Sequence, residues 1–216
     1  RAYDGTNGYE LWKTDGTHAG TVLVKNFSLE GSANVEDLID VDGTLFFTAF
    51  NGENGRELWK SDGTVPGTQL VKDITPGASG TTFGEFLNAQ GTLFFRANDG
   101  TNGYELWKSD GTSTGTVLVK DISPGTSSSY PLNLTEMGGT AFFRADDGSN
   151  GTELWKSDGT SAGTVLVKDI HPGANLSFPN SLTEMGGTLF FSAFDGSNGF
   201  ELWKSDGTSA DRKSTR

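Results

Sequence analysis

The sequence predicts an all-β fold, specifically a β-propeller of four-stranded antiparallel blades with a repeat of about 48 residues. The tetrapeptide Glu-Leu-Trp-Lys occurs five times, at nearly equal intervals along the chain. A fixed period of this length marks an array of supersecondary units. In addition, no segment shows a sustained apolar period of 3.6, so helix is not expected. The five tryptophans are Trp12, Trp59, Trp107, Trp155 and Trp203.

One copy shows the four strands of the repeat. They are expected at Leu134–Met137, Thr140–Arg144, Thr152–Lys156 and Thr164–Lys168. The dipeptide Gly138-Gly139 between the first two strands is typical of a primed hairpin turn. Strands joined by such loops form an antiparallel meander, the topology of a propeller blade. The equivalent turn dipeptides are Asp42-Gly43, Gln90-Gly91 and Gly186-Gly187.

The repeat divides the chain, residues 1–216, into segments of one array. We expect a partial blade at 1–27, blades near 35–72, 84–120 and 132–168, a partial blade at 180–204 and a tail at 209–216. Phe142-Phe143 and Val165-Leu166-Val167 are continuous apolar runs, which suit strands covered on both faces. A β-solenoid is the alternative, but its repeats are usually shorter and lack tight hairpins.

Composition excludes several classes of protein. The formal net charge is −12 and the pI is about 4.5, which argues against nucleic acid and anionic membranes as partners. Cysteine is absent, so the chain has neither disulfides nor a cysteine-ligated metal. No apolar run approaches the length that a membrane-spanning helix needs, so no membrane span is expected.

The longer motif resembles a known family. Glu-Leu-Trp-Lys-x-Asp-Gly-Thr, followed by Gly-Thr-x-Leu-Val-Lys-Asp-Ile, is similar to the bacterial ELWxxDGT-repeat family. The resemblance implies propeller arrays in large, mostly secreted or surface-associated proteins, and so an extracellular or cell-surface location with its signal segment outside this chain. Two departures are Asn26, where other copies have aspartate, and the tail from Asp211, which looks foreign or truncated.

The strand count raises a question of closure. The last copy lacks a fourth strand, and the N-terminal segment Thr21–Lys25 is the strand that could supply it. A two-chain, eight-bladed homo-oligomer is favoured over a four-bladed single chain or a piece of a longer array. Because four blades need only four third strands, Trp12 or Trp203 should lie on a surplus strand.

The loop Asp-Gly-x-Asn-Gly-x-Glu is a candidate cation site. Three oxygen-bearing side chains separated by glycines could surround calcium, the one cofactor considered. The alternative is that Asp and Asn stabilise turns while Glu bonds to buried backbone or pairs with a lysine. The sets are Asp4/Asn7/Glu10, Asn51/Asn54/Glu57, Asp99/Asn102/Glu105, Asp147/Asn150/Glu153 and Asp195/Asn198/Glu201.

Two further motifs are interpreted as structural. Each tryptophan should pack between adjacent blades, with its indole N–H bonded to a neighbouring loop, although stacking on a ligand is the alternative. Ser-Asp-Gly-Thr, for example Ser109–Thr112, should be a turn stabilised by bonds from Asp and Thr to backbone groups.

The linkers between copies carry aromatic residues at nearly equivalent places: Phe83, Tyr130 and Phe178. Variable loops on a constant scaffold are where binding usually resides. These aromatics could therefore bind sugars, or they could fill the gap between blades. The first linker has no aromatic residue after Phe27, which weakens the sugar hypothesis.

No catalytic, cofactor-binding or metal-binding residue is assigned, and the chain is not expected to be an enzyme. Its only histidines, His18 and His171, occupy non-equivalent positions, and no triad pattern accompanies them. We expect a non-enzymatic scaffold or binding module that assembles a closed ring and has a glycan or protein ligand. The alternatives are a multivalent lectin and, less favoured, a propeller hydrolase.

Overall fold

A computed structural model describes residues 1–6, 8–27, 31–197, 199–209 and 212–213. Within these residues every regular element is a β-strand, which confirms the all-β prediction. The strands form one three-stranded sheet and four four-stranded antiparallel sheets. The chain divides into two compact units, Arg1–Phe83 with Asp110–Thr116, and Gly84–Ser109 with Val117–Arg216.

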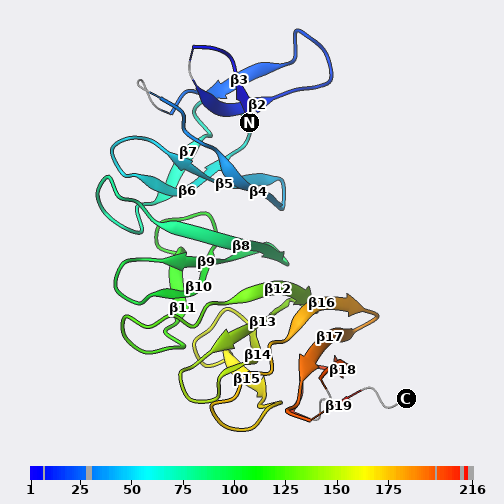
Figure 1. Cartoon of the computed structure of the whole chain (residues 1–216). Helices are drawn as coiled ribbons and strands as arrows, with labels where there is room; N and C mark the ends of the chain where they lie inside the picture. The colour runs from blue at the N-terminus through cyan, green and yellow to red at the C-terminus, as the bar shows by residue number, and fades with distance from the viewer. Residues whose placement is uncertain (7, 28–30, 198, 210–211, 214–216) are drawn as a thin grey trace. The chain divides into compact units, whose positions relative to one another are not determined.

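The first unit contains two sheets (Figure 1). Between their strands the aromatic ring of Phe27 contacts Trp59 and Phe47 edge-on, at centroid distances of 4.9 and 5.8 Å. These buried rings join the two sheets into one core. The sheets are β1 (Ala2–Tyr3), β2 (Tyr9–Lys13) and β3 (Val22–Lys25), then β4 (Glu36–Val41), β5 (Thr44–Phe50), β6 (Arg56–Ser61) and β7 (Gln69–Lys72).

Three further sheets follow along the chain. Each is a four-stranded meander in sequence order, as the repeat predicts. The strands are β8 (Thr82–Ala89), β9 (Thr92–Asn98), β10 (Tyr104–Ser109) and β11 (Val117–Lys120); β12 (Leu132–Met137), β13 (Thr140–Asp146), β14 (Thr152–Ser157) and β15 (Val165–Lys168); and β16 (Asn180–Met185), β17 (Thr188–Phe194), β18 (Phe200–Ser205) and β19 (Arg212–Lys213).

Strand β13 explains the continuous apolar runs. Ala141, Phe143 and Ala145 pack with residues of the β8–β11 sheet, whereas Phe142 packs with residues of the β16–β19 sheet. Phe142 and Phe143 are 2% and 0% exposed. Because a strand alternates its side chains between two faces, a strand covered on both sides needs apolar residues at consecutive positions. The prediction of two covered faces is confirmed for this strand.

The two-residue hairpins have the predicted conformation. Gly138 and Gly139 have φ values of 60° and 83°, and Asp42 and Gly43 have values of 50° and 82°. Positive φ at both central residues matches the right-handed twist of the flanking strands. Thus Gly, Asn or Asp is favoured at these places.

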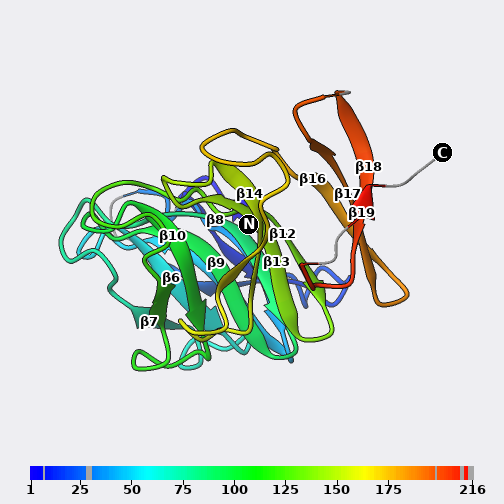
Figure 2. The same cartoon turned by 90° about the horizontal axis from the view of Figure 1, so that it is seen from below.

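The first strands of neighbouring sheets in the second unit lie side by side. Strands β12 and β16 are adjacent in both views (Figures 1 and 2). The Asn133 amide donates to Asn180 Oδ1 at 3.0 Å, and the Thr135 hydroxyl group donates to the carbonyl of Leu182 at 3.2 Å. These bonds connect two sheets that share no backbone ladder.

The fourth place in the last sheet differs from the sequence-based expectation. Strand β19 pairs with β18 through Trp203↔Lys213 and Lys204↔Arg212. The segment Thr21–Lys25 instead contributes β3, which pairs with β2. A tail that departs from Val-Leu-Val-Lys can still extend a sheet because ladder hydrogen bonds use the backbone. Trp12 lies on β2, which has β1 and β3 as its partners, and Trp203 lies on β18, which has β17 and β19 as its partners.

Candidate functional site

The loop Asp99–Asn102 is a turn closed by its own side chains. Asp99 Oδ1 accepts the backbone N–H groups of Thr101 and Asn102 at 2.9 and 2.8 Å, and Oδ2 accepts the Asn102 amide at 2.7 Å. Burial acts to raise the pKa of Asp99, but these hydrogen bonds outweigh it and hold the pKa below its usual value. Asp147 and Asn150 repeat the arrangement with the same consequence for the Asp147 pKa.

The glutamate of the same motif is directed to the next linker. The Glu153 carboxylate accepts hydrogen bonds from the Ile170 N–H at 2.9 Å, the His171 N–H at 3.4 Å and the Ser177 hydroxyl group at 2.6 Å. Glu153 is 0% exposed, so it is the acceptor for linker donors that water cannot reach. It fastens both ends of the linker to β14.

Three other copies repeat this contact. Glu57 accepts the Ile74 N–H and the Thr81 hydroxyl group at 2.9 Å each. Glu105 binds the linker from Ile122 to Ser129 in the same way, and Glu10 accepts the N–H groups of Phe27 and Ala33. The interpretation that Glu bonds to buried backbone is therefore confirmed in these copies.

Burial changes the acidity of these carboxyls. Burial is the largest of the causes that raise the pKa of Glu57 and of Glu153 to about 7, and the nearby charges of Asp73 and Asp169 act in the same direction. The hydrogen bonds from the linkers act in the opposite direction but do not offset burial. Burial likewise raises the pKa of Glu105 and Glu10.

This geometry does not bring the three oxygen-bearing side chains of the motif together as ligands for calcium in the Asp99 and Asp147 loops. In the Asp99 and Asp147 loops the Asp and Asn bond to each other, while the glutamate turns away to the linker. Throughout the described ranges, no three His, Asp or Glu side chains form a group that could hold a metal ion. In the first and last loops, Asn7 and Asn198 lie outside the described residues.

The Asp-Gly-Thr turn has the predicted bonding. Asp158 Oδ1 accepts the Thr160 N–H and hydroxyl group at 2.8 and 2.7 Å, and Thr160 Oγ1 accepts the Gly163 N–H at 2.9 Å. In the turn at Ser109–Thr112, Asp110 Oδ1 likewise accepts the N–H and the hydroxyl group of Thr112. The motif is structural in both places.

The prediction for the indole N–H groups is wrong. The Nε1 atoms of all five tryptophans are buried and have no hydrogen-bond acceptor among the described residues. A carbonyl of the neighbouring loop accepts from a lysine: Lys120 Nζ donates to Thr164 O at 2.9 Å and lies 5.8 Å from the centroid of the Trp155 ring. Lys25 makes the same pair of contacts with Thr68 O and Trp59.

The linker aromatics occupy two equivalent places. Tyr130 and Phe178 both have φ of 48°, and their N–H groups donate to the carbonyls of Tyr104 and Thr152 respectively. Phe83 is one residue out of register, because Thr81 aligns with Ser129 and Ser177 as a glutamate partner. Tyr130 and Phe178 are 53% and 41% exposed, so they do not fill a closed gap.

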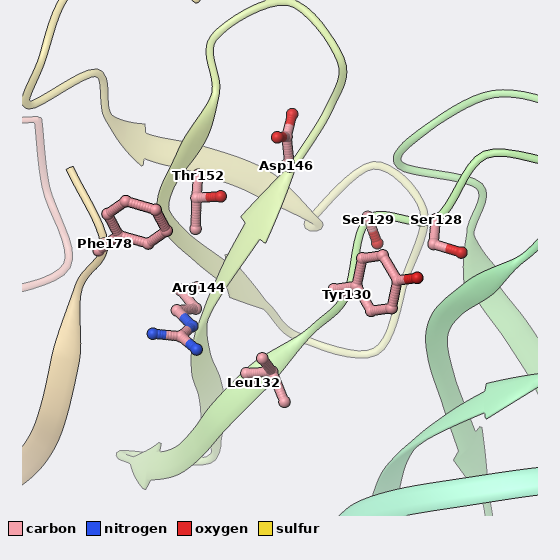
Figure 3. A pocket seen from close by; sticks show the side chains of 8 residues that line it. All are labelled: Ser128, Ser129, Tyr130, Leu132, Arg144, Asp146, Thr152 and Phe178. Carbon is pink, nitrogen blue, oxygen red and sulfur yellow. The ribbon is translucent and has the colours of Figure 1, made fainter. Parts of the chain in front are cut away.

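A pocket of about 290 Å³ lies in the second unit, at the end of β13 (Figure 3). Arg144 and Asp146 come from β13, Thr152 comes from β14, and Tyr130 and Phe178 come from the two linkers. Arg144, Thr152 and Phe178 are grouped on one side of the strand that carries Arg144 (Figure 3). The remaining lining residues are Ser128, Ser129 and Leu132.

The Arg144 guanidinium lines this pocket as a charged group without a partner among the described residues. It forms no hydrogen bond, ion pair or ring contact with any residue that the structure describes. Asp146 Oδ1, in contrast, accepts the Gly148 N–H at 2.7 Å. The pocket therefore contains a half-buried cation, and its lining also includes the aromatic rings of Tyr130 and Phe178.

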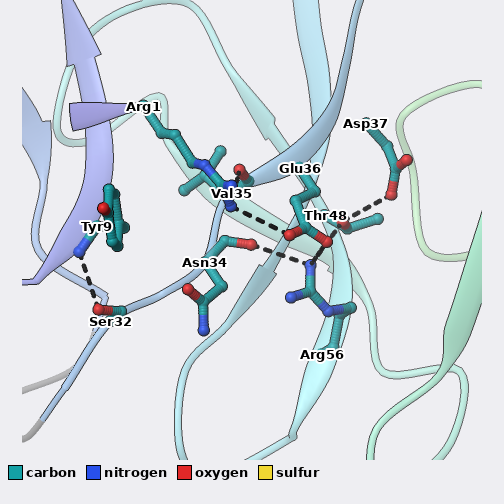
Figure 4. Close-up of polar contacts among 9 residues, drawn as sticks. All are labelled: Arg1, Tyr9, Ser32, Asn34, Val35, Glu36, Asp37, Thr48 and Arg56. Atoms are coloured by element: carbon teal, nitrogen blue, oxygen red, sulfur yellow. Dashed lines mark hydrogen bonds and ion pairs between the residues drawn. The ribbon is translucent and has the colours of Figure 1, made fainter. Parts of the chain in front are cut away.

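In another copy, an arginine at the corresponding place is bonded to other residues of the protein. Arg56, the counterpart of Thr152, donates to the carbonyl of Asn34 and to Thr48 Oγ1 at 3.0 Å each, and it pairs with Glu36 at 3.2 Å (Figure 4). Arg1 approaches the same carboxylate at 3.0 Å. This copy has no unpaired guanidinium among the residues that the structure describes.

Sequence reasoning missed the pocket. Arg144 was placed only as the end of a strand, and Thr152 only as the start of the next. A comparison of copies one repeat apart would have found the difference, because Thr152 aligns with Tyr104. The histidines proved unrelated to the pocket: His171 packs edge-on against Phe194 at 5.2 Å, and His18 is exposed.

No helix in the described part of the chain has the length and apolar character of a membrane span. No family model matches the chain. No curated protein matches it either.

Several solved structures share its fold. A puromycin hydrolase matches with a TM-score of 0.57 at 13% identity over 90% of this chain and 30% of the other. A puromycin-hydrolyzing peptidase of Mycobacterium tuberculosis matches with a TM-score of 0.52 at 12% identity over 91% and 30%. A structure from a study of two prolyl endopeptidases matches with a TM-score of 0.56 at 16% identity over 99% and 31%. The likeness supports a propeller-like all-β fold.

These comparisons correct the expected function. The expectation was a non-enzymatic scaffold that assembles a closed ring, with a multivalent lectin as the alternative. The similar structures are instead those of a hydrolase and of peptidases, and this chain spans about 30% of their length. The expectation rested on repeated units without a residue set unique to one copy, but similar folds also occur within longer hydrolases and peptidases.

Proposed function

We propose that this chain is the β-propeller part of a multidomain peptidase, with its four-stranded sheets as the blades. The observation that carries the proposal is the asymmetry of coverage: the matches use 90% to 99% of this chain but only 30% to 31% of the peptidases. A match of this kind aligns most of this chain with about a third of each longer protein. The resemblance to the ELWxxDGT-repeat family supports the assignment of the repeats as blades.

In this proposal the chain itself does not cleave peptides. Its most polar buried groups, Glu57, Glu105 and Glu153, are occupied by linker hydrogen bonds and hold neighbouring segments in place. The residues that break the peptide bond would lie in a catalytic domain outside these 216 residues. The propeller would then contribute to the shape of the space that a peptide enters.

The experiment compares the natural protein that carries this sequence with the 216-residue chain alone. Both are incubated with puromycin and with short proline-containing peptide amides of a fluorogenic amine, and release of the amine is measured. We expect hydrolysis by the natural protein and none by the isolated chain. Hydrolysis by the isolated chain would contradict the division of roles, and an inactive natural protein that folds normally would contradict the peptidase assignment.

A further inference from the structure

At the place that corresponds to the Arg144 pocket, the preceding copy has an arginine and two aromatic rings in contact. The guanidinium of Arg96 lies 5.3 Å from the centroid of the Tyr104 ring. The same ring stacks on Tyr130 at 5.4 Å, with an angle of 25° between the planes. Tyr104 therefore contacts both a cation and a second ring, an arrangement stabilised by the ring quadrupole and by burial.

The Arg144 copy has the arginine and one aromatic ring but lacks the ring that contacts both of them in the preceding copy. Arg144 aligns with Arg96, and Phe178 aligns with Tyr130 and has the same φ of 48°. At the position of Tyr104 the chain has Thr152, whose side chain lacks a ring. Arg144, Phe178 and Thr152 all line the pocket, on the same side of the strand that carries Arg144 (Figure 3).

None of the other copies has an arginine at this place with the adjoining ring position unfilled. In the first copy the Arg1 guanidinium lies 5.4 Å from the Tyr9 ring. In the second, Arg56 is bonded to Thr48 and Glu36. In the last, Ser192 replaces the arginine, and Phe200 contacts Phe194 at 6.0 Å. Among the copies, only that of Arg144 combines an arginine on the second strand with a residue at the start of the third strand that is neither aromatic nor charged.

We infer that this pocket binds an aromatic ring of a ligand, which inserts between the Arg144 guanidinium and the Phe178 ring where a tyrosine would otherwise lie. The ligand class is a compound or a peptide side chain with a phenyl or phenol ring. Leu132 supplies apolar contact, and Asp146, on the same strand, offers an acceptor to a phenol or an amine. This inference does not depend on the proposed peptidase role.

Binding should be weak and selective for the ring. The probe is N-acetyl-L-tyrosine amide, titrated into the full chain and followed by chemical-shift changes in NMR spectra. N-acetyl-L-leucine amide is the aliphatic control, because it has the same backbone without a ring. We expect saturable binding of the tyrosine compound and at least about fivefold weaker binding of the leucine compound, since a cation–ring contact is lost.

The decisive variant is Thr152→Tyr, with Thr152→Ser as its matched control. Tyrosine at 152 should fill the site from within, as Tyr104 does in the preceding copy, and should abolish binding without loss of folding. Thr152→Ser should bind as the unchanged chain does. Arg144→Gln keeps the polar length of the side chain but removes the cation, and should weaken binding about tenfold.

Three results would overturn the inference. They are equal affinity for the two amides, unchanged binding in a folded Thr152→Tyr variant, and a set of shifted resonances that excludes the pocket residues. A tyrosine-containing tripeptide and free 4-methylphenol are titrated in parallel. Tighter binding of the tripeptide identifies a peptide as the source of the ring, and tighter binding of the phenol identifies a small molecule.

Discussion

The Ser177 hydroxyl group donates a 2.6 Å hydrogen bond to the buried carboxylate of Glu153, 24 residues earlier in the chain. This contact joins the third strand of one sheet to the linker that begins the next sheet. The same carboxylate accepts the Ile170 N–H at the start of the linker. One side chain therefore fixes both ends of a connection that has no regular secondary structure of its own.

Glu153→Ala should destabilise the chain substantially. The substitution leaves the Ile170 and His171 N–H groups and the Ser177 hydroxyl group without their acceptor in a region closed to water. Each unsatisfied buried donor costs about 1–3 kcal/mol, so we expect a loss of roughly 2–4 kcal/mol after relaxation. Urea unfolding followed by tryptophan fluorescence measures it.

Glu201 provides a matched control for that measurement. It occupies the same place in the last Glu-Leu-Trp-Lys copy, but it makes no hydrogen bond with the described residues. Glu201→Ala should therefore change the free energy of unfolding by less than about 0.5 kcal/mol. Equal losses in the two variants would show that the linker bonds do not account for the effect.

Stability should fall as the pH rises from 4.5 to 7. The pKa values of Glu57 and Glu153 are about 7 in the folded chain and 4.5 without the fold. Between these pH values the folded state binds more protons than the unfolded state. The stabilisation that Glu57 and Glu153 contribute is therefore fully present below pH 4.5 and is lost as the pH rises through 7. Thermal melts should give a higher Tm at pH 5 than at pH 8.

The Glu153→Ala variant tests the source of this pH dependence. Removing the group should make the decrease in Tm between pH 5 and pH 8 smaller than in the unchanged chain, and Glu201→Ala should leave the decrease as it was. A Tm that rises over this range would contradict the raised pKa values. The lowered pKa of Asp99 and Asp147 acts at more acidic pH and does not reverse the trend.

Periodic features of the fold could be read from the sequence, because they follow from backbone geometry. Phe142 and Phe143 had to face opposite sides of a strand, and Gly138-Gly139 had to form a primed turn. Features that depend on competition between neighbours could not be read. The indole N–H of Trp155 lacks an acceptor, whereas Lys120, from the preceding copy, donates to the loop carbonyl of Thr164, and nothing in the motif indicates which donor is satisfied.

The pocket and the last strand were missed for two further reasons. The pocket arises from a difference between copies, Thr152 against Tyr104, whereas a repeat is recognised by what its copies share. Strand β19 forms on a tail without the Val-Leu-Val-Lys pattern, since pairing with Trp203 and Lys204 needs only backbone groups. Both features concern single copies, for which periodicity carries no information.

Lys120→Met should reduce stability by about 1 kcal/mol, because it removes a charged hydrogen bond and a cation–ring contact while keeping the apolar stem. The Nζ atom of Lys120 bonds to Thr164 O at 2.9 Å and lies 5.8 Å from the Trp155 ring. Lys204→Met is the control, since Lys204 is exposed and has no such contact among the described residues. Chemical denaturation compares them, and equal midpoints for the two variants would contradict the role of the ammonium group.

Gly163→Ala should destabilise the Asp-Gly-Thr turn for a steric reason. A Cβ atom at 163 would collide with the carboxylate of Asp158, which is held by the N–H and hydroxyl groups of Thr160. We expect a loss of about 1–3 kcal/mol, the usual range for overpacking. The double variant Asp158→Ala with Gly163→Ala removes the obstructing group, so its loss should be smaller than the sum of the two single losses. Additive losses in urea denaturation would show that the glycine is needed for some reason other than the approach of Asp158.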